Sequence, residues 1–277
     1  MSGKLLAAAV AGVGVVDPER AVVSADDEGF SRGRAAFETL RVYGGRPFRL
    51  AEHITRLIGS AERLGLPEPS ADVLRALADA ALGAADAGEA VLRLYWTPGA
   101  REGAPSALAL VSAVPEWIEP ARARGQQLVS LLFPRRSAPW LLPGTKSVSY
   151  AAHAAAESEA KRRGADDALL VDLDGTVLEG TVTNIWWREG QLLVTPSLEL
   201  GILAGETRAA LLALAGELGY EVETGSYPLE RVLAADEVFT SSSVREVMPI
   251  VSLDGREYAS RDAAAGLQLA LRDLAAG

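Results

Sequence analysis

The feature that most constrains the fold is a pair of tight turns, each flanked by apolar runs, in the C-terminal half of the chain. In "ADDALLVDLDGTVLEG" the turn falls at Asp174-Gly175, and in "NIWWREGQLLVTP" it falls at Glu189-Gly190. A Gly-containing pair between two short apolar runs predicts a β-hairpin. A third such turn, Gly44-Gly45, lies in "AAFETLRVYGGRPFRL". Since hairpin strands pair antiparallel, we expect antiparallel sheet in both halves of the chain.

Helical patterns alternate with these strands. Residues 50–64 place apolar side chains at helical spacing and end at Gly65. A second helical pattern covers about residues 70–86, and a third covers 151–163. The segment "AGETRAALLALAGELG" predicts a helix that ends at Gly219, and a further helix closes the chain. This order of elements predicts an α+β protein.

The chain of 277 residues is long enough for two domains. Its start predicts a first hairpin, with a strand, a turn at Asp17-Pro18 and a second strand. Residues 113–125 contain two prolines and little periodicity, so we expect the domain connection there. The predicted domains are a small N-terminal one, residues 1–116, and a larger C-terminal one, residues 117–277.

Composition excludes several classes of function. A net charge of -10 disfavours a nucleic-acid partner, which would need clustered basic surface. No apolar run reaches the roughly 18 residues of a membrane span, and we expect a cytoplasmic protein. The chain has no cysteine, and two histidines, His53 and His153, are too few for a histidine-rich metal site. Any chemistry must come from Lys, Ser, Thr, Tyr, Arg, carboxylates or a bound cofactor.

Two residues stand out as candidate chemical groups. Lys146 lies in the loop "GTKS" before a helix, and Glu179 follows the turn at Asp174-Gly175. A lysine shielded from water can form a Schiff base with a carbonyl group. A carboxylate can pair with the pyridine nitrogen of pyridoxal phosphate, PLP, and so favour the protonated ring. Most lysines in loops are solvated surface groups. Lys146 is therefore a candidate catalytic residue only in combination with other cofactor-binding groups.

Three candidate anion-binding elements occur in the sequence in addition to Lys146 and Glu179. Gly205 precedes a helix whose first turn holds Thr207, where free backbone N–H groups favour phosphate. The strand "FTSSSVRE" ends in serines whose hydroxyls and amides suit an anion, and Arg56 supplies a cation. Each has an ordinary alternative, namely a helix start, a turn and a surface ion pair. A lysine, a carboxylate and split anion-binding loops are together the set that PLP requires.

Five motifs in this chain resemble those of class IV, or fold type IV, PLP-dependent enzymes. The resemblance spans about residues 22–256 and keeps the order and spacing of the family. It implies a two-domain α+β fold, with a small sandwich-like N-terminal domain and a larger C-terminal domain with a β-barrel-like core. The motifs are "DDEGFSRGRAAFETLRVYGGRPFRLAEHITRL", "TKSVSY", "ADDALLVDLDGTVLEGTVTNIWW", "GILAGETR" and "DEVFTSSSVREVMPIVSLDG".

The resemblance also implies roles for single residues. Lys146 forms the Schiff base with PLP and moves the proton at the substrate α-carbon, and Glu179 pairs with the pyridine nitrogen. His53 is expected to be structural, packing its helix against a strand. The remaining cofactor-binding candidates are Arg56, Thr207, Ser242 and Ser243 for the phosphate, with Thr183, Asn184 and Tyr150 beside the ring.

Departures from the family pattern bear on the substrate. A Thr-Arg-Gly turn followed by a histidine, which binds substrate carboxylate in D-amino-acid transaminases, is replaced by Thr97-Pro98-Gly99. Where the family commonly has Gly-Asp-Gly, this chain has Arg34 in the middle position. We hypothesise that Arg34 and Arg93 bind the substrate carboxylate, with Arg101 in reserve. The alternative is a structural ion pair for Arg34 and a solvent-facing or dimer-contact Arg93.

Three hypotheses of function are weighed, beside a lower-ranked branched-chain aminotransferase. The preferred one is transamination between D-amino acids and 2-oxo acids. The second is a lyase that eliminates pyruvate from aminodeoxychorismate, and a branched-chain aminotransferase ranks below both because "FET" stands where that group usually reads "FEG". A third, of a different class, is a catalytically inactive scaffold, against which the complete residue set argues. The resemblance further implies a homodimer with the active site at the domain junction.

Overall fold

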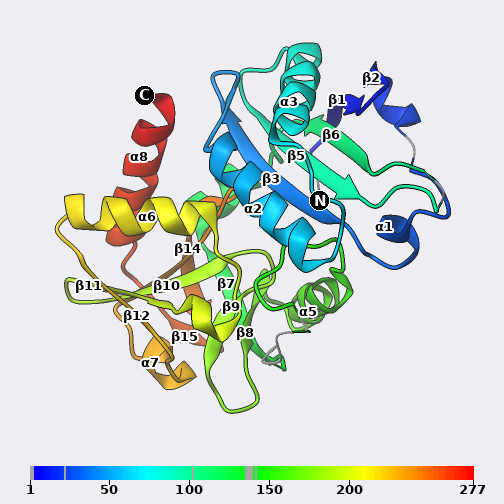
Figure 1. Cartoon of the computed structure of the whole chain (residues 1–277). Coiled ribbons are helices and arrows are strands. Elements are labelled where there is room, and N and C mark those ends of the chain that lie inside the picture. Colours follow the sequence, from blue (N-terminus) through cyan, green and yellow to red (C-terminus); the bar gives the residue numbers. More distant parts are fainter. Residues whose placement is uncertain (1–2, 22, 102, 135–139, 141) are drawn as a thin grey trace. The chain divides into compact units, whose positions relative to one another are not determined.

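The computed structural model describes residues 3–21, 23–101, 103–134, 140 and 142–277. They form two compact units, one of residues 1–116 with Thr145–Tyr150 and one of Trp117–Gly144 with Ala151–Gly277 (Figure 1). Each unit combines an antiparallel or mixed sheet with helices, and the predicted α+β class is confirmed. The expected domain ranges differ from these units in one respect, since Thr145–Tyr150 belongs with the first unit.

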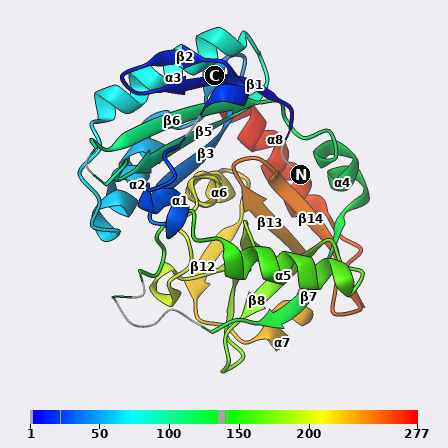
Figure 2. The ribbon, with the colours of Figure 1, turned by 90° about the vertical axis from the view of Figure 1, so that its right-hand side faces the viewer.

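The first unit has a six-stranded sheet in the order β2-β1-β6-β5-β3-β4. Helices α2 and α3 contact this sheet and cover the same face of it (Figures 1 and 2). The elements are β1 (Leu5–Val10), β2 (Gly14–Val16), α1 (Glu28–Ser31), β3 (Ala36–Tyr43), β4 (Arg46–Pro47), α2 (Leu50–Arg63), α3 (Ala71–Ala85), β5 (Ala90–Thr97) and β6 (Ser106–Ser112).

Strand alternation divides the residues of this sheet between its two faces. On β3, Ala36, Leu40 and Val42 pack into the core below α2 and α3, as do the even-numbered residues of β5. The odd-numbered residues of both strands therefore face the opposite side, which we call the helix-free face. In the register of the two strands, Phe37 lies opposite Tyr95.

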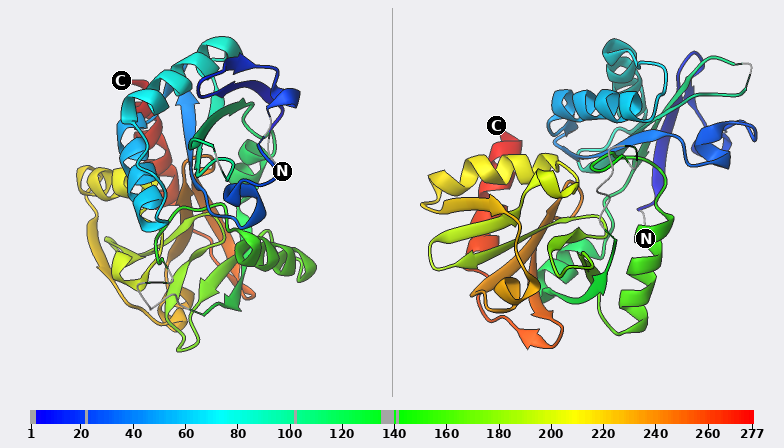
Figure 3. Two further views of the ribbon diagram at one scale, coloured as in Figure 1. Left: turned by 45° about the vertical axis from the view of Figure 1, so that its right-hand side comes forward. Right: turned by 60° about the horizontal axis from the view of Figure 1, so that its bottom comes forward.

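The second unit has a nine-stranded sheet that curls into a half-barrel (Figure 3). Helices α6 and α8 contact β13, and α5 contacts β8. None of the helices in the described ranges is long and apolar enough to span a bilayer. The elements are α4 (Ile118–Arg124), β7 (Gln126–Leu132), α5 (Ala151–Arg162), β8 (Asp167–Val171), β9 (Val177–Gly180), β10 (Asn184–Glu189), β11 (Leu192–Pro196), α6 (Glu206–Glu217), β12 (Glu221–Gly225), α7 (Leu229–Leu233), β13 (Glu237–Ser242), β14 (Glu246–Leu253), β15 (Arg256–Glu257) and α8 (Asp262–Ala276).

The first hairpin forms at a different place from the one predicted. Strands β1 and β2 pair around a turn that contains Gly12. Gly12 has φ 76° and Gly14 has φ 93°, which these residues adopt without a steric penalty. Residues Pro18–Arg20 form a 3-10 helix capped by the Asp17 side chain. The Asp-Pro pair therefore starts a helical turn and does not join two strands, because Pro fits the first helical position.

The predicted irregular connection at residues 113–125 contains helix α4. Pro120 is the third residue of this helix, where a backbone N–H has no partner within the helix and its loss is tolerated. Ile118 and Ala121 are buried and anchor the helix in the second unit. Tertiary burial thus stabilises a helix that the short periodic pattern did not reveal.

Candidate active site

The segment around Lys146 is attached to the start of β3. The Lys146 carbonyl accepts a hydrogen bond from the Phe37 backbone N–H at 3.2 Å, and the Val148 N–H donates to the Ala35 carbonyl at 3.0 Å. The Lys146 backbone N–H donates to Ser60 Oγ of α2 at 3.2 Å. These bonds explain why residues 145–150 belong with the first unit, and they fix the lysine backbone on both sides.

The Lys146 side chain lies over an aromatic surface on the helix-free face. Its Nζ atom is 4.4 Å from the centre of the Phe37 ring. Tyr95 stacks on Phe37 with ring centres 5.8 Å apart, and Tyr150 meets Phe37 edge-on at 5.5 Å. Burial raises the pKa of Tyr95, against an opposing effect of Arg93. The amine therefore lies over the face of an aromatic ring, in a cation–π arrangement.

Arg93 lies on the same face, two residues from Tyr95 along β5. Its guanidinium makes one long hydrogen bond, from Nη1 to Ser112 Oγ at 3.4 Å. In the described part of the chain it has no carboxylate partner within 4 Å. A guanidinium with this much unused donor capacity suits a carboxylate ligand.

Arg34, the other proposed carboxylate ligand, is already held by its own unit. Its Nη1 donates to Glu28 Oε2 at 2.7 Å, and its Nε and Nη2 donate to the carbonyls of Leu64 and Gly65 at 3.1 and 2.6 Å. This is the arrangement that the structural alternative predicts. A role for Arg34 in substrate binding stays a prediction, and Arg93 is the better placed of the two.

Arg56 forms a bidentate ion pair with Glu38, a residue to which the sequence pattern assigned no role. Its Nε donates to Glu38 Oε1 at 2.7 Å and its Nη2 donates to Oε2 at 2.6 Å. His53 Nδ1 lies 2.6 Å from the same Oε2 atom, in agreement with a structural role. Glu38 is fully buried on the core face of β3. Burial opposes its ionisation, but the bonds with Arg56 and His53 outweigh burial and lower its pKa to about 2.

The second unit holds Glu179 by a loop and a neighbouring strand. The Leu203 backbone N–H lies 3.2 and 3.1 Å from the two carboxylate oxygens, and Asn184 Nδ2 donates to Oε2 at 3.3 Å. Asn184 also donates to the Leu203 carbonyl at 3.0 Å. A side chain at Gly205 would place its Cβ 2.1 Å from Asn184 Oδ1. Only glycine fits there, so the start of α6 is packed directly on the amide that orients Glu179.

Thr183 belongs to the tight connection between β9 and β10. The Gly180 backbone N–H donates to the Thr183 carbonyl at 2.7 Å. A Cβ at Gly180 would lie 2.2 Å from Thr183 Oγ1. In the same connection Thr181 donates to the buried Asp167 carboxylate at 2.5 Å. Thr183 and Asn184 therefore follow Glu179 on a connection with a fixed backbone.

The phosphate-binding candidates of the second unit lie on two elements joined by packing. Thr207 is buried in the first turn of α6, and Ser242 and Ser243 occupy the end of β13 and the following turn. Helix α6 contacts β13. Gly205 precedes α6 and has no side chain that could cap the first N–H groups of the helix. Such N–H groups at a helix start can bind an anion.

These residues fit PLP by their chemistry. The first unit provides an amine over an aromatic ring, and the second provides a carboxylate held by two donors together with hydroxyl groups and a helix start. A carboxylate such as that of Glu179 is the kind of group that accepts a hydrogen bond from a pyridinium N–H.

Comparison with known proteins identifies the family. The model described as "Amino-transferase class IV" matches residues 35–253. The aminodeoxychorismate lyase of Bacillus subtilis (strain 168) is 32% identical over 267 residues, 92% of this chain and 90% of the relative. The bifunctional aminodeoxychorismate lyase / D-amino acid transaminase of Mycobacterium tuberculosis (strain ATCC 25618 / H37Rv) is 33% identical over 259 residues, 87% of this chain and 89% of the relative.

Solved structures agree with this relationship. The fold IV-transaminase CpuTA1 from Curtobacterium pusillum superposes with a TM-score of 0.88 at 35% identity, covering 96% of this chain and 97% of that chain. The PLP-bound form of a hypothetical aminotransferase from Mycobacterium tuberculosis has a TM-score of 0.91 at 30% identity, covering 97% and 98%. The chain is therefore a member of the class IV aminotransferase family, with the fold of type IV transaminases and PLP as its cofactor.

Proposed function

We propose that the protein transfers the amino group between D-amino acids and 2-oxo acids. The observation that carries this proposal is the helix-free face of the first unit, where the Lys146 amine and the Arg93 guanidinium share one surface. Arg93 is two residues along β5 from Tyr95, which is about 7 Å of strand. That spacing suits a substrate whose carboxylate binds Arg93 while its α-carbon approaches Lys146. The bifunctional relative from Mycobacterium tuberculosis, at 33% identity, supports the same activity.

Bound PLP supplies an aldehyde for the amine and a ring that accepts electrons from the substrate α-carbon. In our proposal Lys146 provides the attaching amine and then carries the proton to and from the α-carbon. The Phe37 ring lies 4.4 Å from the amine and helps to orient it.

Glu179 accepts the hydrogen bond of the pyridine N–H in this proposal. Its carboxylate is oriented by Asn184 and by the Leu203 N–H. Thr207, Ser242 and Ser243 donate to the phosphate, together with N–H groups of α6. Arg56 adds a cation whose direction is fixed by Glu38. Thr183 and Tyr150 are assigned to the neighbourhood of the ring.

The substrate carboxylate selects the hand of the amino acid in this scheme. A carboxylate held by Arg93 and an amino group joined to PLP would fix two of the four substituents of the α-carbon. The side chain and the hydrogen then exchange places between the two enantiomers. Only one enantiomer directs its hydrogen at the lysine amine, and we propose that this is the D-form.

A second candidate function is the elimination of pyruvate from aminodeoxychorismate. The Bacillus subtilis relative that carries this name is 32% identical over nearly the whole chain. This substrate also carries carboxylates, so Arg93 would serve it equally. The two functions share Lys146 and Glu179 and differ in what leaves the substrate.

A half-reaction separates the candidates. The holoenzyme is mixed separately with D-alanine, L-alanine, L-leucine and aminodeoxychorismate, and the absorbance of the bound cofactor is followed. We expect D-alanine alone among the amino acids to convert the cofactor to its amino form. Formation of 4-aminobenzoate without any conversion by the amino acids would establish the lyase. Conversion by L-leucine would instead favour a branched-chain aminotransferase.

We also propose that the protein is a homodimer, as the family resemblance implies. Size-exclusion chromatography with light scattering gives the mass of the holoenzyme directly, for comparison with the 29.1 kDa of one chain. A monomeric mass in fully active enzyme would refute this part of the proposal.

A further inference from the structure

The turn between β13 and β14 has an unusual residue at its end. Residues Ser243–Arg245 form the turn, and Glu246 pairs with Ser242 across the hairpin. Glu246 has a φ of 54°, in the left-handed region that glycine usually occupies in three-residue hairpin loops. A non-glycine residue in this region costs roughly 1 kcal/mol or more. The surrounding contacts must therefore hold Glu246 in place.

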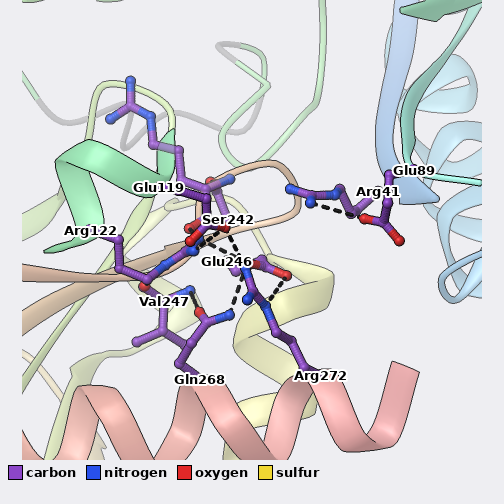
Figure 4. A network of polar contacts seen from close by, with 10 residues as sticks. Arg41, Glu89, Glu119, Arg122, Ser242, Glu246, Val247, Gln268 and Arg272 are labelled. Carbon is purple, nitrogen blue, oxygen red and sulfur yellow. Dashed lines mark hydrogen bonds and ion pairs between the residues drawn. The ribbon is translucent and has the colours of Figure 1, made fainter. Parts of the chain in front are cut away.

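Glu246 is fully buried and its carboxylate is held by three side chains from two helices (Figure 4). Arg122 of α4 donates to Oε2 at 2.8 Å. Gln268 and Arg272 of α8 each donate to the same oxygen at 2.8 Å. A buried carboxylate with partners from separate elements fixes those elements relative to each other, because loss of any partner leaves a buried charge underpaired.

Arg122 also holds the backbone of the turn. Its Nη2 donates to the Arg245 carbonyl at 2.8 Å, and its Nε donates to the Val247 carbonyl at 3.1 Å. These two carbonyls flank Glu246 in the sequence. A single guanidinium therefore binds the carboxylate of the strained residue and the backbone carbonyls of the residues before and after it.

The turn also contains a cation, Arg245, whose guanidinium pairs with a carboxylate of another strand. Arg245 Nη1 donates to the buried Asp167 carboxylate at 2.5 Å, and its guanidinium lies 5.3 Å from the centre of the Trp117 ring. The Arg245 charge is thereby paired. An anion at the turn would meet the hydroxyl groups of Ser242 and Ser243 and nearby backbone N–H groups, whose positions depend on the backbone that Arg122 holds.

We propose that Arg122 is a positioning residue for the PLP phosphate, acting through Glu246 and the two carbonyls to preform the Ser242–Ser243 turn. The inference rests on the proposed function, which places the phosphate at these serines. It gives α4, the helix in the predicted domain connection, a role in cofactor binding. A residue needed only for folding would affect all ligands alike, whereas a phosphate-positioning residue affects only ligands that carry phosphate.

The test compares PLP with pyridoxal, which has the same ring and aldehyde but no phosphate. Dissociation constants of both are measured on cofactor-depleted wild-type protein and on Arg122→Lys, which keeps a cation beside Glu246 but loses the forked donors. The matched control is Arg124→Lys on the same helix. Arg124 pairs with Asp166 at 2.8 and 2.9 Å and is 56% exposed, away from the turn.

We expect Arg122→Lys to raise the dissociation constant of PLP by about tenfold and that of pyridoxal by less than about twofold, since one or two charge-assisted hydrogen bonds are lost. Arg124→Lys should change neither. Gln268→Ala is a second variant that keeps both arginines. It removes one donor to Glu246 and the acceptor of the Val247 N–H, and should give a smaller loss of the same selectivity.

Equal weakening of PLP and pyridoxal, or unchanged PLP binding in both variants, would overturn the positioning role while leaving the proposed function intact. Failure of the wild-type protein to bind PLP would overturn the proposed function and this inference with it. Selective weakening of PLP in Arg122→Lys and in Gln268→Ala, but not in Arg124→Lys, supports the inference.

Discussion

The buried ion pair between Glu38 and Arg56 leads to a quantitative prediction for Glu38→Gln. The substitution keeps the shape of the side chain and removes its charge. The pKa of Glu38 is lowered from 4.5 to about 2, although burial acts in the opposite direction. At about 1.4 kcal/mol per pKa unit, ionised Glu38 contributes about 3 kcal/mol to the free energy of unfolding at neutral pH. We expect Glu38→Gln to lose about that amount at pH 7.

The sign of the pH dependence follows from linkage. Because the folded-state pKa is the lower one, the contribution of Glu38 is fully present above about pH 4.5 and is lost as the pH falls towards 2. At pH 3.5 the unfolded carboxyl is mostly protonated while the folded one is still ionised. The difference between wild type and variant should then shrink to about 2 kcal/mol.

Urea unfolding of both proteins at pH 7 and pH 3.5 measures this difference. The cofactor is removed from both, so that a change in PLP affinity does not alter apparent stability. Glu52→Gln on α2 is the matched control, because Glu52 pairs with Arg49 at 3.4 Å on the surface and should contribute less than about 1 kcal/mol. A difference below 1 kcal/mol at pH 7, or an equal difference at both pH values, would refute the electrostatic reasoning.

Three further predictions concern the site. Gly205→Ala should raise the dissociation constant of PLP by about tenfold, because the added Cβ displaces the Asn184 amide from Glu179. The control is Gly216→Ala in α6, whose Cβ would meet no described atom within 4 Å and which should leave PLP binding unchanged. Fluorescence titration with PLP checks both, and equal affinities would show that the Asn184 contact is dispensable. Arg93→Met should raise the KM for the amino acid by about tenfold or more, and Arg34→Met should raise it less. Steady-state kinetics measure both values, and a larger KM increase in Arg34→Met would indicate that Arg34 is the carboxylate ligand. Lys146→Ala should abolish the covalent attachment of PLP, and a borohydride-stable mass increase in that variant would place the attachment elsewhere.

Local patterns in the sequence predicted most of the individual elements. The hairpins at Asp174-Gly175 and Glu189-Gly190 form as β8-β9 and β10-β11. Helices α2 and α3 begin and end within two residues of the predicted bounds. These signals depend on neighbours a few residues apart. Helix α4 escaped prediction because seven residues with a proline show little periodicity, and its stability comes from burial of Ile118 and Ala121.

The structure also revealed how the candidate residues are held. Glu38 lies between Ala36 and Leu40 on the core face of β3. Only the packing of α2 on that strand shows that it meets Arg56 and His53. Arg34 and Arg93 could not be distinguished by sequence. Arg34 donates to Glu28, Leu64 and Gly65, whereas Arg93 has one long hydrogen bond within the described residues.

The sequence by itself therefore determined the class of fold, the family and the chemical identity of the candidate groups, since turns, helical periodicity and residue types are local properties. Tertiary structure alone decided which charges are paired. The contacts of Arg122 with Glu246, and of Arg245 with Asp167, join residues 124 and 78 positions apart. Such pairs form only when folding brings distant segments together, and burial then makes each unpaired charge costly.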